Sequence, residues 1–360
     1  MNGSLTFDDY KKLIKDKEIE TKDFNQSRVQ PSSMDLTLSN ECYELRYSFL
    51  SPKGKIRNKL KTLSIKRYDL TNGLVFKKNH TYLVRLNEKL NLNSPIKGKC
   101  NPKSSTGRLD IFCRVILDYT DEYEKVPYGY SGDIFLEVTT RAFDIFLTKG
   151  DSLNQMRLTN ISNDFIRDED LRKFHNNEAI IFDQNDYLLK PNISSGLKIS
   201  VDLSSKDQII AYKAKKKSPK LIFSKKHIHD PRKYWEFIKK DNGNLTIFPN
   251  EFFILKSKQK IRIPKTMAAE MVPYDTSIGD FRVHYAGFFD PGFGDRNGSY
   301  AVLEVKTHEV PFNIEDGQYI ARLIFENLNK NTDFTYGSKI NSNYQNQELA
   351  LSKHFNIIRK

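Results

Sequence analysis

Short apolar runs bounded by polar residues dominate the chain and predict a protein built mainly from β-strands. Residues 6–20 are the exception, because their apolar side chains recur at helical spacing and predict a short helix; these are Phe7, Tyr10, Leu13 and Ile14. The strand-like runs are each closed by Gly, Pro, Asn or Asp. They cover residues 33–38, 81–86, 110–117, 133–138 and 143–147, and then 197–203, 252–255, 260–263, 301–305 and 320–325. Many short strands at regular spacing are typical of a β-sandwich or barrel.

The two halves of the chain look like copies of each other. Three pairs of residues in similar surroundings share one offset of 167 positions: Asp35 and Asp202, Glu137 and Glu304, and Gly150 and Gly317. Agreement at a single offset indicates an internal duplication. We therefore predict one β domain over residues 1–165, a polar linker over 166–195, and a second β domain over 196–360. An aromatic cluster around 231–239 predicts a helical insertion within the second domain.

Length and cysteine content narrow the class of protein. With 360 residues, of which 38% are hydrophobic, the chain is long enough for two compact cores. No run approaches the ~18 apolar residues of a membrane span, and the N-terminus lacks the apolar stretch of a secretory signal. We expect a soluble cytoplasmic protein. Cys42, Cys100 and Cys113 form no C-x-x-C pair, and no His is placed to complete a zinc site, which argues against the zinc-dependent nucleobase deaminases.

The formal net charge of +13 suits an anionic partner, which could be nucleic acid, an acidic membrane or a phosphorylated small molecule. The basic residues are dispersed along the chain, except for a dense run at 213–220 that we interpret as a solvated loop. No nucleic-acid-binding motif is legible. Charge alone therefore does not decide among these partners.

Residues 101–110, NPKSSTGRLD, form the most distinctive segment. Small residues, hydroxyls and a glycine make a turn whose backbone N–H groups can face an anion, while Lys103 and Arg108 supply positive charge. The segment is not a Walker loop, because Gly-x-x-x-x-Gly-Lys is missing. A phosphate-binding turn and an ordinary hairpin turn fit this pattern equally well.

Three further stretches carry candidate chemistry. Glu137 lies within an apolar strand, where it either lines a pocket or faces solvent, because a buried carboxylate is costly unless paired. Residues 284–294, HYAGFFDPGFG, predict a β-hairpin whose main chain could read a planar base or could simply be a structural turn. The tail carries Tyr336 and Gln347 among Gly and Asn residues; such an arm usually frays, but its side chains would also suit a lid.

Together these segments resemble the dUTPase-like superfamily, and most closely the bacterial dCTP deaminases of the long, duplicated type. The resemblance implies two tandem dUTPase-like β-barrel or sandwich domains of the β-clip type, with few short helices. It assigns Ser104, Ser105 and Arg108 to the phosphate motif, with Lys103, Thr106 and Gly107 beside them. It also assigns Glu137 and Glu304 to the strand of the catalytic glutamate, Ala286, Phe289 and Asp290 to the hairpin around the pyrimidine and deoxyribose, and Tyr336 and Gln347 to the closing arm.

The matched motifs are unevenly shared between the halves. The first half keeps the phosphate motif and Glu137, whereas the second keeps the hairpin, Glu304 and the arm. Sites of this superfamily form between neighbouring folds, so we expect the two halves to complement each other. The glutamate is expected near the Ser-Arg motif of its own fold, which favours Glu137 over Glu304 as the catalytic residue.

The resemblance implies hydrolytic, zinc-independent deamination of dCTP to dUTP and ammonia. A carboxylate, Glu137, would take a proton from water and pass one to the departing amine. Ser104 and Arg108 would orient it. Mg²⁺ would enter with the triphosphate. We expect a homo-oligomer with sites at domain or subunit interfaces, and no nucleic-acid or membrane partner.

Three alternatives to this function stay open. The first is a dUTPase, or a bifunctional enzyme that converts dCTP to dUMP, because sequence does not exclude a water placed at the α-phosphate. The second is a non-catalytic, nucleotide-binding regulatory protein, which the decayed motifs in each half would suit. The third is a basic nucleic-acid-binding β-protein, which rests on charge alone.

Overall fold

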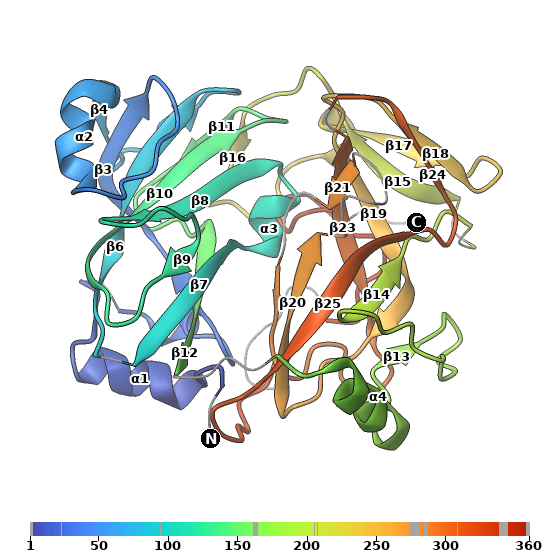
Figure 1. Cartoon of the computed structure of the whole chain (residues 1–360). Helices are drawn as coiled ribbons and strands as arrows, with labels where there is room; N and C mark the ends of the chain where they lie inside the picture. The colour runs from blue at the N-terminus through green and yellow to red at the C-terminus, as the bar shows by residue number, and fades with distance from the viewer. Residues whose placement is uncertain are drawn as a thin grey trace.

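The computed structural model is built mainly from β-strands, with few short helices, as the sequence predicted. It describes residues 3–22, 24–93, 95–160, 165–204, 206, 208–273, 281–283, 287–307, 309–337 and 345–357. In Figure 1 the N-terminal half lies on the left and the C-terminal half on the right, and the single-turn helix α3 (Ser104–Gly107) lies between them.

A six-stranded antiparallel sheet forms the centre of the N-terminal half, in the order β4-β3-β6-β10-β8 with β1 also paired to β6. Its strands are β1 (Ile19–Glu20), β3 (Leu38–Leu45), β4 (Ser64–Asp69), β6 (Thr81–Asn91), β8 (Ile111–Leu117) and β10 (Ser131–Thr140). A four-stranded sheet packs beside it in the order β2-β12-β7-β9, formed by β2 (Met34–Leu36), β7 (Ile96–Pro102), β9 (Lys125–Val126) and β12 (Asn154–Asn160).

The C-terminal half repeats this strand order. Its six-stranded sheet runs β17-β15-β19-β23-β21 with β13 also paired to β19, and its four-stranded sheet runs β14-β25-β20-β22. The strands of the first are β13 (Ile181–Phe182), β15 (Ile209–Ala214), β17 (Trp235–Lys239), β19 (Phe253–Ile261), β21 (Phe281–Val283) and β23 (Ser299–Thr307). Those of the second are β14 (Leu197–Ser200), β20 (Met267–Pro273), β22 (Phe288–Phe289) and β25 (Tyr319–Asn327).

Two small sheets and a few helices complete the described structure. One small sheet contains β5 (Leu74–Phe76), β11 (Ile145–Leu147) and β16 (Leu221–Ile222), and the other contains β18 (Asn244–Ile247) and β24 (Phe312–Glu315). The helices are α1 (Phe7–Lys15), α2 (Ile56–Leu63), α3 and α4 (Asp168–Asn177), with 3₁₀ turns η1 (Gln26–Arg28) and η2 (Pro231–Lys233). Among the described residues, none of these helices has the length and apolarity to cross a membrane.

Helix α1 confirms the helix predicted near the N-terminus. Phe7, Tyr10 and Leu13 are buried along one face, as their spacing predicted. The side chain of Asp9 accepts a hydrogen bond from the backbone N–H of Thr6 at 2.9 Å, within a capping box that satisfies N–H groups left open by the first turn. The helix ends at Lys15, earlier than expected, and Lys17 has a positive φ of 60°.

The prediction of a helix around 231–239 is wrong. Only the 3₁₀ turn η2 forms there, and the chain continues as β17, which pairs with β15 along one edge of the sheet. Trp235 is buried, while Glu236 and Lys239 are exposed. A short aromatic run fits a helix and an edge strand equally well, and pairing with β15 decides between them. The residues predicted as a linker contain α4 and β13, whose apolar side chains Leu171 and Ile181 are buried.

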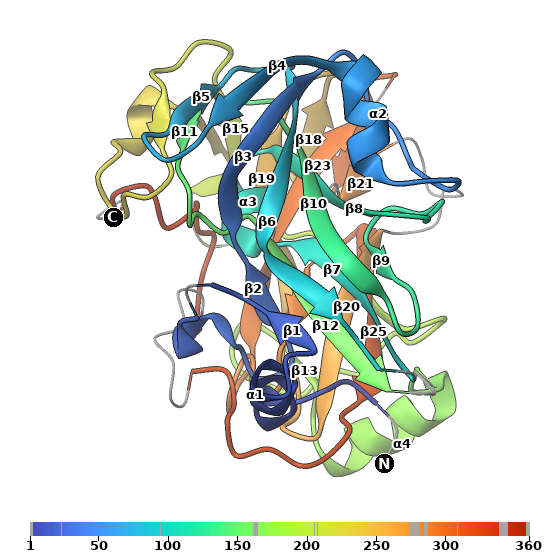
Figure 2. The ribbon, with the colours of Figure 1, turned by 90° about the vertical axis from the view of Figure 1, so that its left-hand side faces the viewer.

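One hydrophobic core crosses from the first half into the second. Leu136 and Val138 of β10 share a cluster of buried side chains with Trp235, Ile254 and Val302 of the C-terminal sheet. Figure 2 views the molecule with the N-terminal half in front of the C-terminal half. Because the two halves share this core, residues from both can converge on one buried site.

Helix α2 covers the outer face of the N-terminal sheet. Ile56 and Leu60 of α2 pack with Leu83, Ile116 and Phe135 in a separate hydrophobic cluster. Phe135 and Glu137 alternate with core residues along β10 and therefore face this side of the sheet. Glu304 holds the equivalent position on β23 of the C-terminal half, where its neighbours Leu303 and Val305 point into the C-terminal core.

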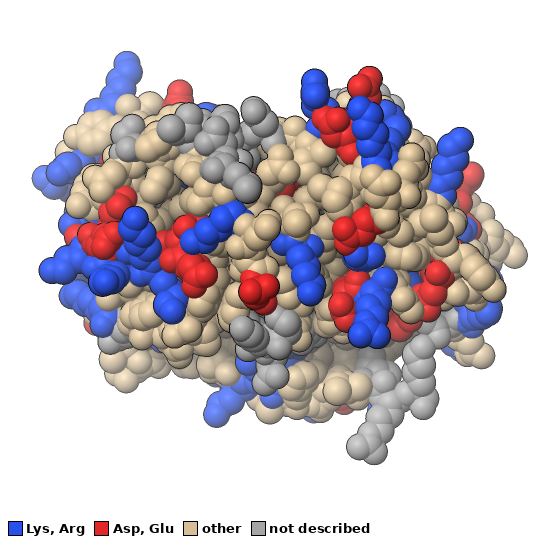
Figure 3. All heavy atoms as spheres, turned by 90° about the horizontal axis from the view of Figure 1, so that it is seen from below, with Lys and Arg blue, Asp and Glu red and all other residues tan. Residues whose placement is uncertain are grey.

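Surface charge of both signs is mixed on the face drawn in Figure 3, where Lys and Arg side chains lie among Asp and Glu. The basic run at 213–220 begins at the end of β15 and continues as an irregular segment, in which Lys216, Lys217 and Lys220 are exposed. This arrangement agrees with the interpretation of that run as a solvated loop.

Candidate active site

The candidate phosphate-binding motif, residues 101–110, forms a tight turn at the boundary between the halves. After β7, the backbone N–H of Lys103 donates to the carbonyl of Leu153 at 3.0 Å, and residues 104–107 then form α3. The turn closes at Asp110, whose φ of +56° lies in the left-handed region. This sharp reversal buries Arg108, which keeps only 2% of its surface exposed.

Arg108 faces a glutamate of the other half. Its Nε lies 4.0 Å from Oε1 of Glu304, which belongs to the central strand β23. Glu304 is 4% exposed. Burial raises the pKa of Glu304 to about 8, although the positive charge of Arg108 opposes that shift. The site therefore holds a carboxyl group that can be either protonated or ionised near neutral pH.

The C-terminal tail crosses this pair and fixes Arg108. Arg108 donates from Nη2 to Oε1 of Gln347 at 2.8 Å and from Nη1 to the carbonyl of Ala350 at 3.1 Å. Gln347 in turn donates from Nε2 to the carbonyl of Tyr300 on β23 at 2.8 Å. Gln347 thus bridges the arginine of the first half to the glutamate strand of the second.

The tail is anchored beyond the site as well. The backbone N–H of Asn356 donates to the carbonyl of His229 at 2.9 Å. The ring of Phe355 packs among aromatic residues, with its centroid 5.2 Å from Tyr234 and 6.0 Å from Trp235. Residues 345–357 therefore form a strap held on both sides of Arg108, rather than an arm that frays from its end.

Tyr336, which the sequence assigned to the closing arm, lies beside the hairpin. Its backbone N–H donates to the carbonyl of Pro291 at 2.7 Å, and its ring centroid is 5.7 Å from that of Phe293. The hairpin also approaches the motif, because a Cβ placed on Gly287 would lie 3.9 Å from Oγ of Ser104. Ala286 lies outside the described residues.

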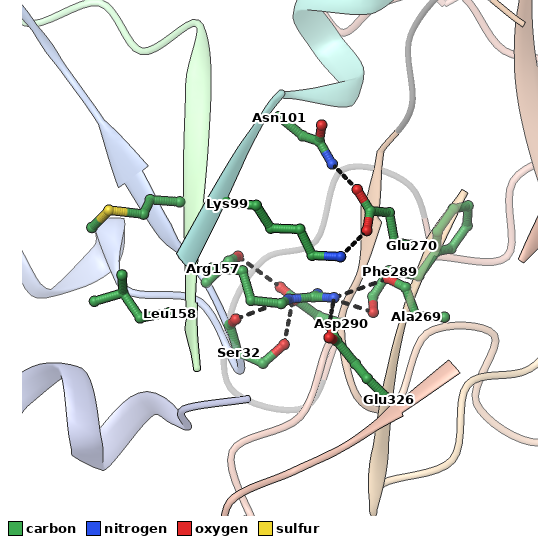
Figure 4. A network of polar contacts seen from close by, with 12 residues as sticks. Ser32, Lys99, Asn101, Arg157, Leu158, Ala269, Glu270, Phe289, Asp290 and Glu326 are labelled. Carbon is green, nitrogen blue, oxygen red and sulfur yellow. Dashed lines mark hydrogen bonds and ion pairs between the residues drawn. The ribbon is translucent and has the colours of Figure 1, made fainter. Parts of the chain in front are cut away.

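The side chain of Asp290 and the backbone carbonyl of Phe289 face Arg157 at the interface between the halves (Figure 4), whereas the ring of Phe289 packs against Phe293. Arg157 donates from Nη2 to Oδ1 of Asp290 at 3.0 Å and to the carbonyl of Phe289 at 3.3 Å. Ser32 donates from Oγ to the same Asp290 oxygen at 2.9 Å. Burial raises the pKa of Asp290, and Arg157 opposes that rise.

The other residues of the motif lie around α3. Lys103 forms an ion pair with Asp35 and donates to Oγ of Ser152 at 3.4 Å. Ser105, Thr106 and Gly107 are buried. The carbonyl of Ser105 accepts a hydrogen bond from Oγ of Ser352 in the strap at 2.8 Å.

Glu137 is not beside Arg108, and the expectation that the nearest glutamate belongs to the same half as the Ser-Arg motif is wrong. Glu137 is 2% exposed and accepts a hydrogen bond from Nη2 of Arg114 at 2.6 Å. Arg114 also donates to Ser48 at 3.0 Å and stacks 3.6 Å from the ring centroid of Tyr123. The physical reason is that α2 and its neighbouring loop cover this face of β10, whereas α3 faces β23.

Sequence reasoning missed two lysines near the site. Lys306 lies two residues beyond Glu304 and pairs with Asp110 at 2.5 Å. Lys256 of β19 contacts the strap through Oε2 of Glu348 at 3.1 Å. Both lysines interrupt otherwise apolar strand runs, and this is the signal that could have found them. In the described part of the chain, no three His, Cys, Asp or Glu residues gather as a metal-binding group.

Comparison with known proteins places this chain in a family. The C-terminal-domain model of 2'-deoxycytidine 5'-triphosphate deaminase (DCD) matches residues 167–355, and the N-terminal-domain model of the same enzyme matches residues 1–162. This chain belongs to the dCTP deaminase family. The boundary between the two matched domains lies just before α4, the first helix after the strands of the N-terminal half.

A solved dCTP deaminase supports the same assignment across the whole fold. The structure of 2'-deoxycytidine 5'-triphosphate deaminase from Agrobacterium tumefaciens is 37% identical in sequence, with a TM-score of 0.87, and covers 92% of this chain and 99% of that chain. A protein from Coprothermobacter proteolyticus named "dCTP deaminase, dUMP-forming" is 26% identical over 132 residues. That match spans 36% of this chain and 66% of the relative, slightly less than two thirds of its length.

Proposed function

We propose that this protein hydrolyses the cytosine amino group of dCTP, giving dUTP and ammonia for the supply of pyrimidine deoxynucleotides. Membership of the dCTP deaminase family supports this reaction. The observation that carries the proposal is the buried contact between Arg108 of one half and Glu304 of the other, at the turn that also carries Ser104. This contact brings the carboxyl group of Glu304, which can act as acid or base, next to the candidate phosphate-binding motif.

Glu304, rather than Glu137, is the catalytic carboxylate in this proposal. Its ionised form takes a proton from water as the oxygen attacks C4 of the cytosine ring. Its protonated form gives that proton to N3 of the ring. Glu304 then takes the proton of the new C4 hydroxyl and passes it to the amino nitrogen, the bond between C4 and that nitrogen breaks, and ammonia leaves as the C4 carbonyl forms. A pKa of about 8 makes both forms of Glu304 accessible at neutral pH.

Arg108 and Ser104 orient this chemistry. The guanidinium of Arg108 is fixed by Gln347 and the carbonyl of Ala350, so it can hold the Glu304 carboxylate in one position. Preorganised groups of this kind stabilise developing charge without having to rearrange during the reaction. Ser104 begins the α3 turn that ends at Arg108, and its Oγ approaches Gly287 of the hairpin, so in this proposal its hydroxyl holds the attacking water.

The triphosphate would lie against α3 and Lys103. Ser104 and Ser105 offer hydroxyl groups and Lys103 offers a positive charge, whereas the backbone N–H groups of Thr106 and Gly107 already donate to the carbonyl of Lys103. The hairpin with Ala286, Phe289 and Asp290, together with Tyr336, would enclose the nucleoside. Mg²⁺ would arrive as part of the Mg·dCTP substrate, because the triphosphate oxygens are the ligands it prefers.

The repeated strand order supports a duplication of one dUTPase-like domain within this chain. In this proposal the two copies have specialised: the first contributes the phosphate motif, and the second contributes Glu304, the hairpin and the strap. One chain then supplies both sides of a site. Association into a homo-oligomer stays a prediction, which light scattering in solution would test.

Product analysis tests the proposed function. Incubation of the protein with Mg·dCTP is expected to release ammonia and dUTP in equal amounts. The name of the Coprothermobacter relative makes dUMP the alternative product, and its appearance with pyrophosphate would show the bifunctional reaction. Binding of dCTP without release of ammonia would contradict the proposal and favour a regulatory role.

The pH dependence of the reaction follows from the raised pKa of Glu304. The base must be ionised to take the proton from water, so kcat/KM is expected to rise with pH and level off above about 8. A pH–rate profile for dCTP measures this directly. A profile that falls as pH rises through the neutral range would contradict the assignment of Glu304 as the base.

A further inference from the structure

A second pair of opposite charges lies next to Arg108 and Glu304. Nζ of Lys306 is 2.5 Å from Oδ2 of Asp110, and the two residues are 8% and 1% exposed. Burial lowers the pKa of Lys306, and the negative charge of Asp110 opposes that shift. Taking two charges out of water is costly unless their geometry is good, so a buried lysine with this partner calls for an explanation.

On both β23 and the turn after α3, the two charged residues that form these ion pairs are two positions apart. Lys306 is two residues beyond Glu304 on β23, and alternation along a strand places both side chains on one face. Asp110 is likewise two residues beyond Arg108, at the end of the turn that follows α3. Each segment thus carries one positive and one negative charge, and each charge meets its opposite across the boundary between the halves.

The backbone at Asp110 forms the end of the turn that follows α3. Its φ of +56° is a conformation that glycine adopts without cost and that side-chain-bearing residues rarely adopt. The carbonyl of Asp110 accepts a hydrogen bond from the N–H of Arg141 at 3.0 Å, which holds this turn in place. Asp is among the side-chain-bearing residues that adopt this conformation most readily, so the turn accommodates Asp110 and places its carboxylate toward Lys306.

We propose that Lys306 and Asp110 are positioning residues that set the distance between Glu304 and the Arg108–Ser104 motif. This inference rests on the proposed function. Gln347 already bridges Arg108 to β23, and the Lys306–Asp110 pair adds a second direct ionic contact between the motif and that strand. Two contacts separated by one strand repeat fix both the separation and the orientation of the two segments, and displacements of about 1 Å are enough to cost ~10²-fold in rate.

Lys306→Met and Asp110→Asn test this inference. Both variants are expected to bind dCTP with a KM close to that of the wild type and to lose ~10²-fold in kcat, because substrate contacts remain while the reacting groups shift. The double variant is expected to lose no more than the worse single variant, since the two residues act as one unit. Lys306→Arg, which keeps the charge, is expected to retain more of the wild-type kcat than Lys306→Met.

Lys213→Met provides a matched control. Lys213 of β15 lies in the same sheet and pairs with Glu251 at 2.5 Å. It is in register with Phe253 and Val305, so alternation places its side chain on the opposite face of the sheet from Glu304. This variant is expected to keep the wild-type kcat. Asp110→Asn, which tolerates a positive φ, keeps the test valid if Lys306→Met does not fold.

The outcomes separate this inference from the proposed function. If the wild-type protein releases no ammonia from dCTP, the proposed function fails and the inference fails with it. If the wild type is active and the folded variants keep its kcat, only the positioning role is overturned. A lower melting temperature with unchanged kcat would show that the pair is merely structural.

Discussion

Glu304→Gln is expected to lower kcat for dCTP hydrolysis by ~10²–10⁴-fold, because an amide cannot take the proton of the attacking water. The change is nearly isosteric, so the contact between Arg108 and residue 304 can remain. Binding of dCTP should survive, and KM should change little. Release of ammonia under saturating dCTP measures the effect, and circular dichroism confirms that the variant is folded.

Glu137→Gln is the matched control, since Glu137 occupies the corresponding strand position in the other half. Its partner is Arg114, and α2 covers its face of the sheet. The variant is expected to turn over dCTP at close to the wild-type rate. Loss of activity in Glu137→Gln together with normal activity in Glu304→Gln would reverse the assignment.

Arg157→Met is expected to lower the free energy of unfolding by about 3–5 kcal/mol, because it leaves buried carboxylates without their partner. Arg157 is fully buried and donates to Oε1 of Glu326 at 2.6 Å and to Oδ1 of Asp290 at 3.0 Å. It also donates to the carbonyls of Ser32 at 3.2 Å and Ala269 at 3.0 Å. One side chain from β12 thus joins several segments across the boundary between the halves (Figure 4).

Urea unfolding monitored by fluorescence measures this loss of stability. The chain contains one tryptophan, Trp235, which is buried in the shared core and reports directly on unfolding. Arg167→Met is the control, because Arg167 forms an exposed pair with Asp170 and such pairs contribute little. An unfolding midpoint of Arg157→Met equal to that of the wild type would contradict a central role for this network.

Local sequence patterns predicted the elements of this protein well. Alternation along 133–138 predicted that Ile134, Leu136 and Val138 share one side of a strand, and these three side chains are buried in the main core. Helical spacing at the N-terminus predicted α1. These features depend on neighbouring residues, whose geometry a strand or helix repeats at a fixed interval. The helix prediction for the aromatic run at 231–239 failed because the run is too short to distinguish the spacing of a helix from the alternation of a strand.

The candidate site was predicted only in part. Apolar and polar alternation along a strand shows which side chains share a face of the sheet, but it does not show which other element packs on that face. The motif of Ser104 and Arg108 and both glutamates were visible in the sequence. Glu137 and Glu304 occupy equivalent apolar strands, so alternation treats them alike. In the structure, Glu137 pairs with Arg114 under α2, whereas Glu304 meets Arg108 from the other half.

The sequence by itself determined a mainly β chain, repeated motifs at one offset, and the residues able to bind phosphate or carry a proton. Only the tertiary structure decided which of those residues meet. The contact between Arg108 and Glu304, and that between Asp110 and Lys306, join residues that are far apart in the chain. Such contacts depend on how two folded halves pack on each other, and no local repeat in the sequence encodes that packing.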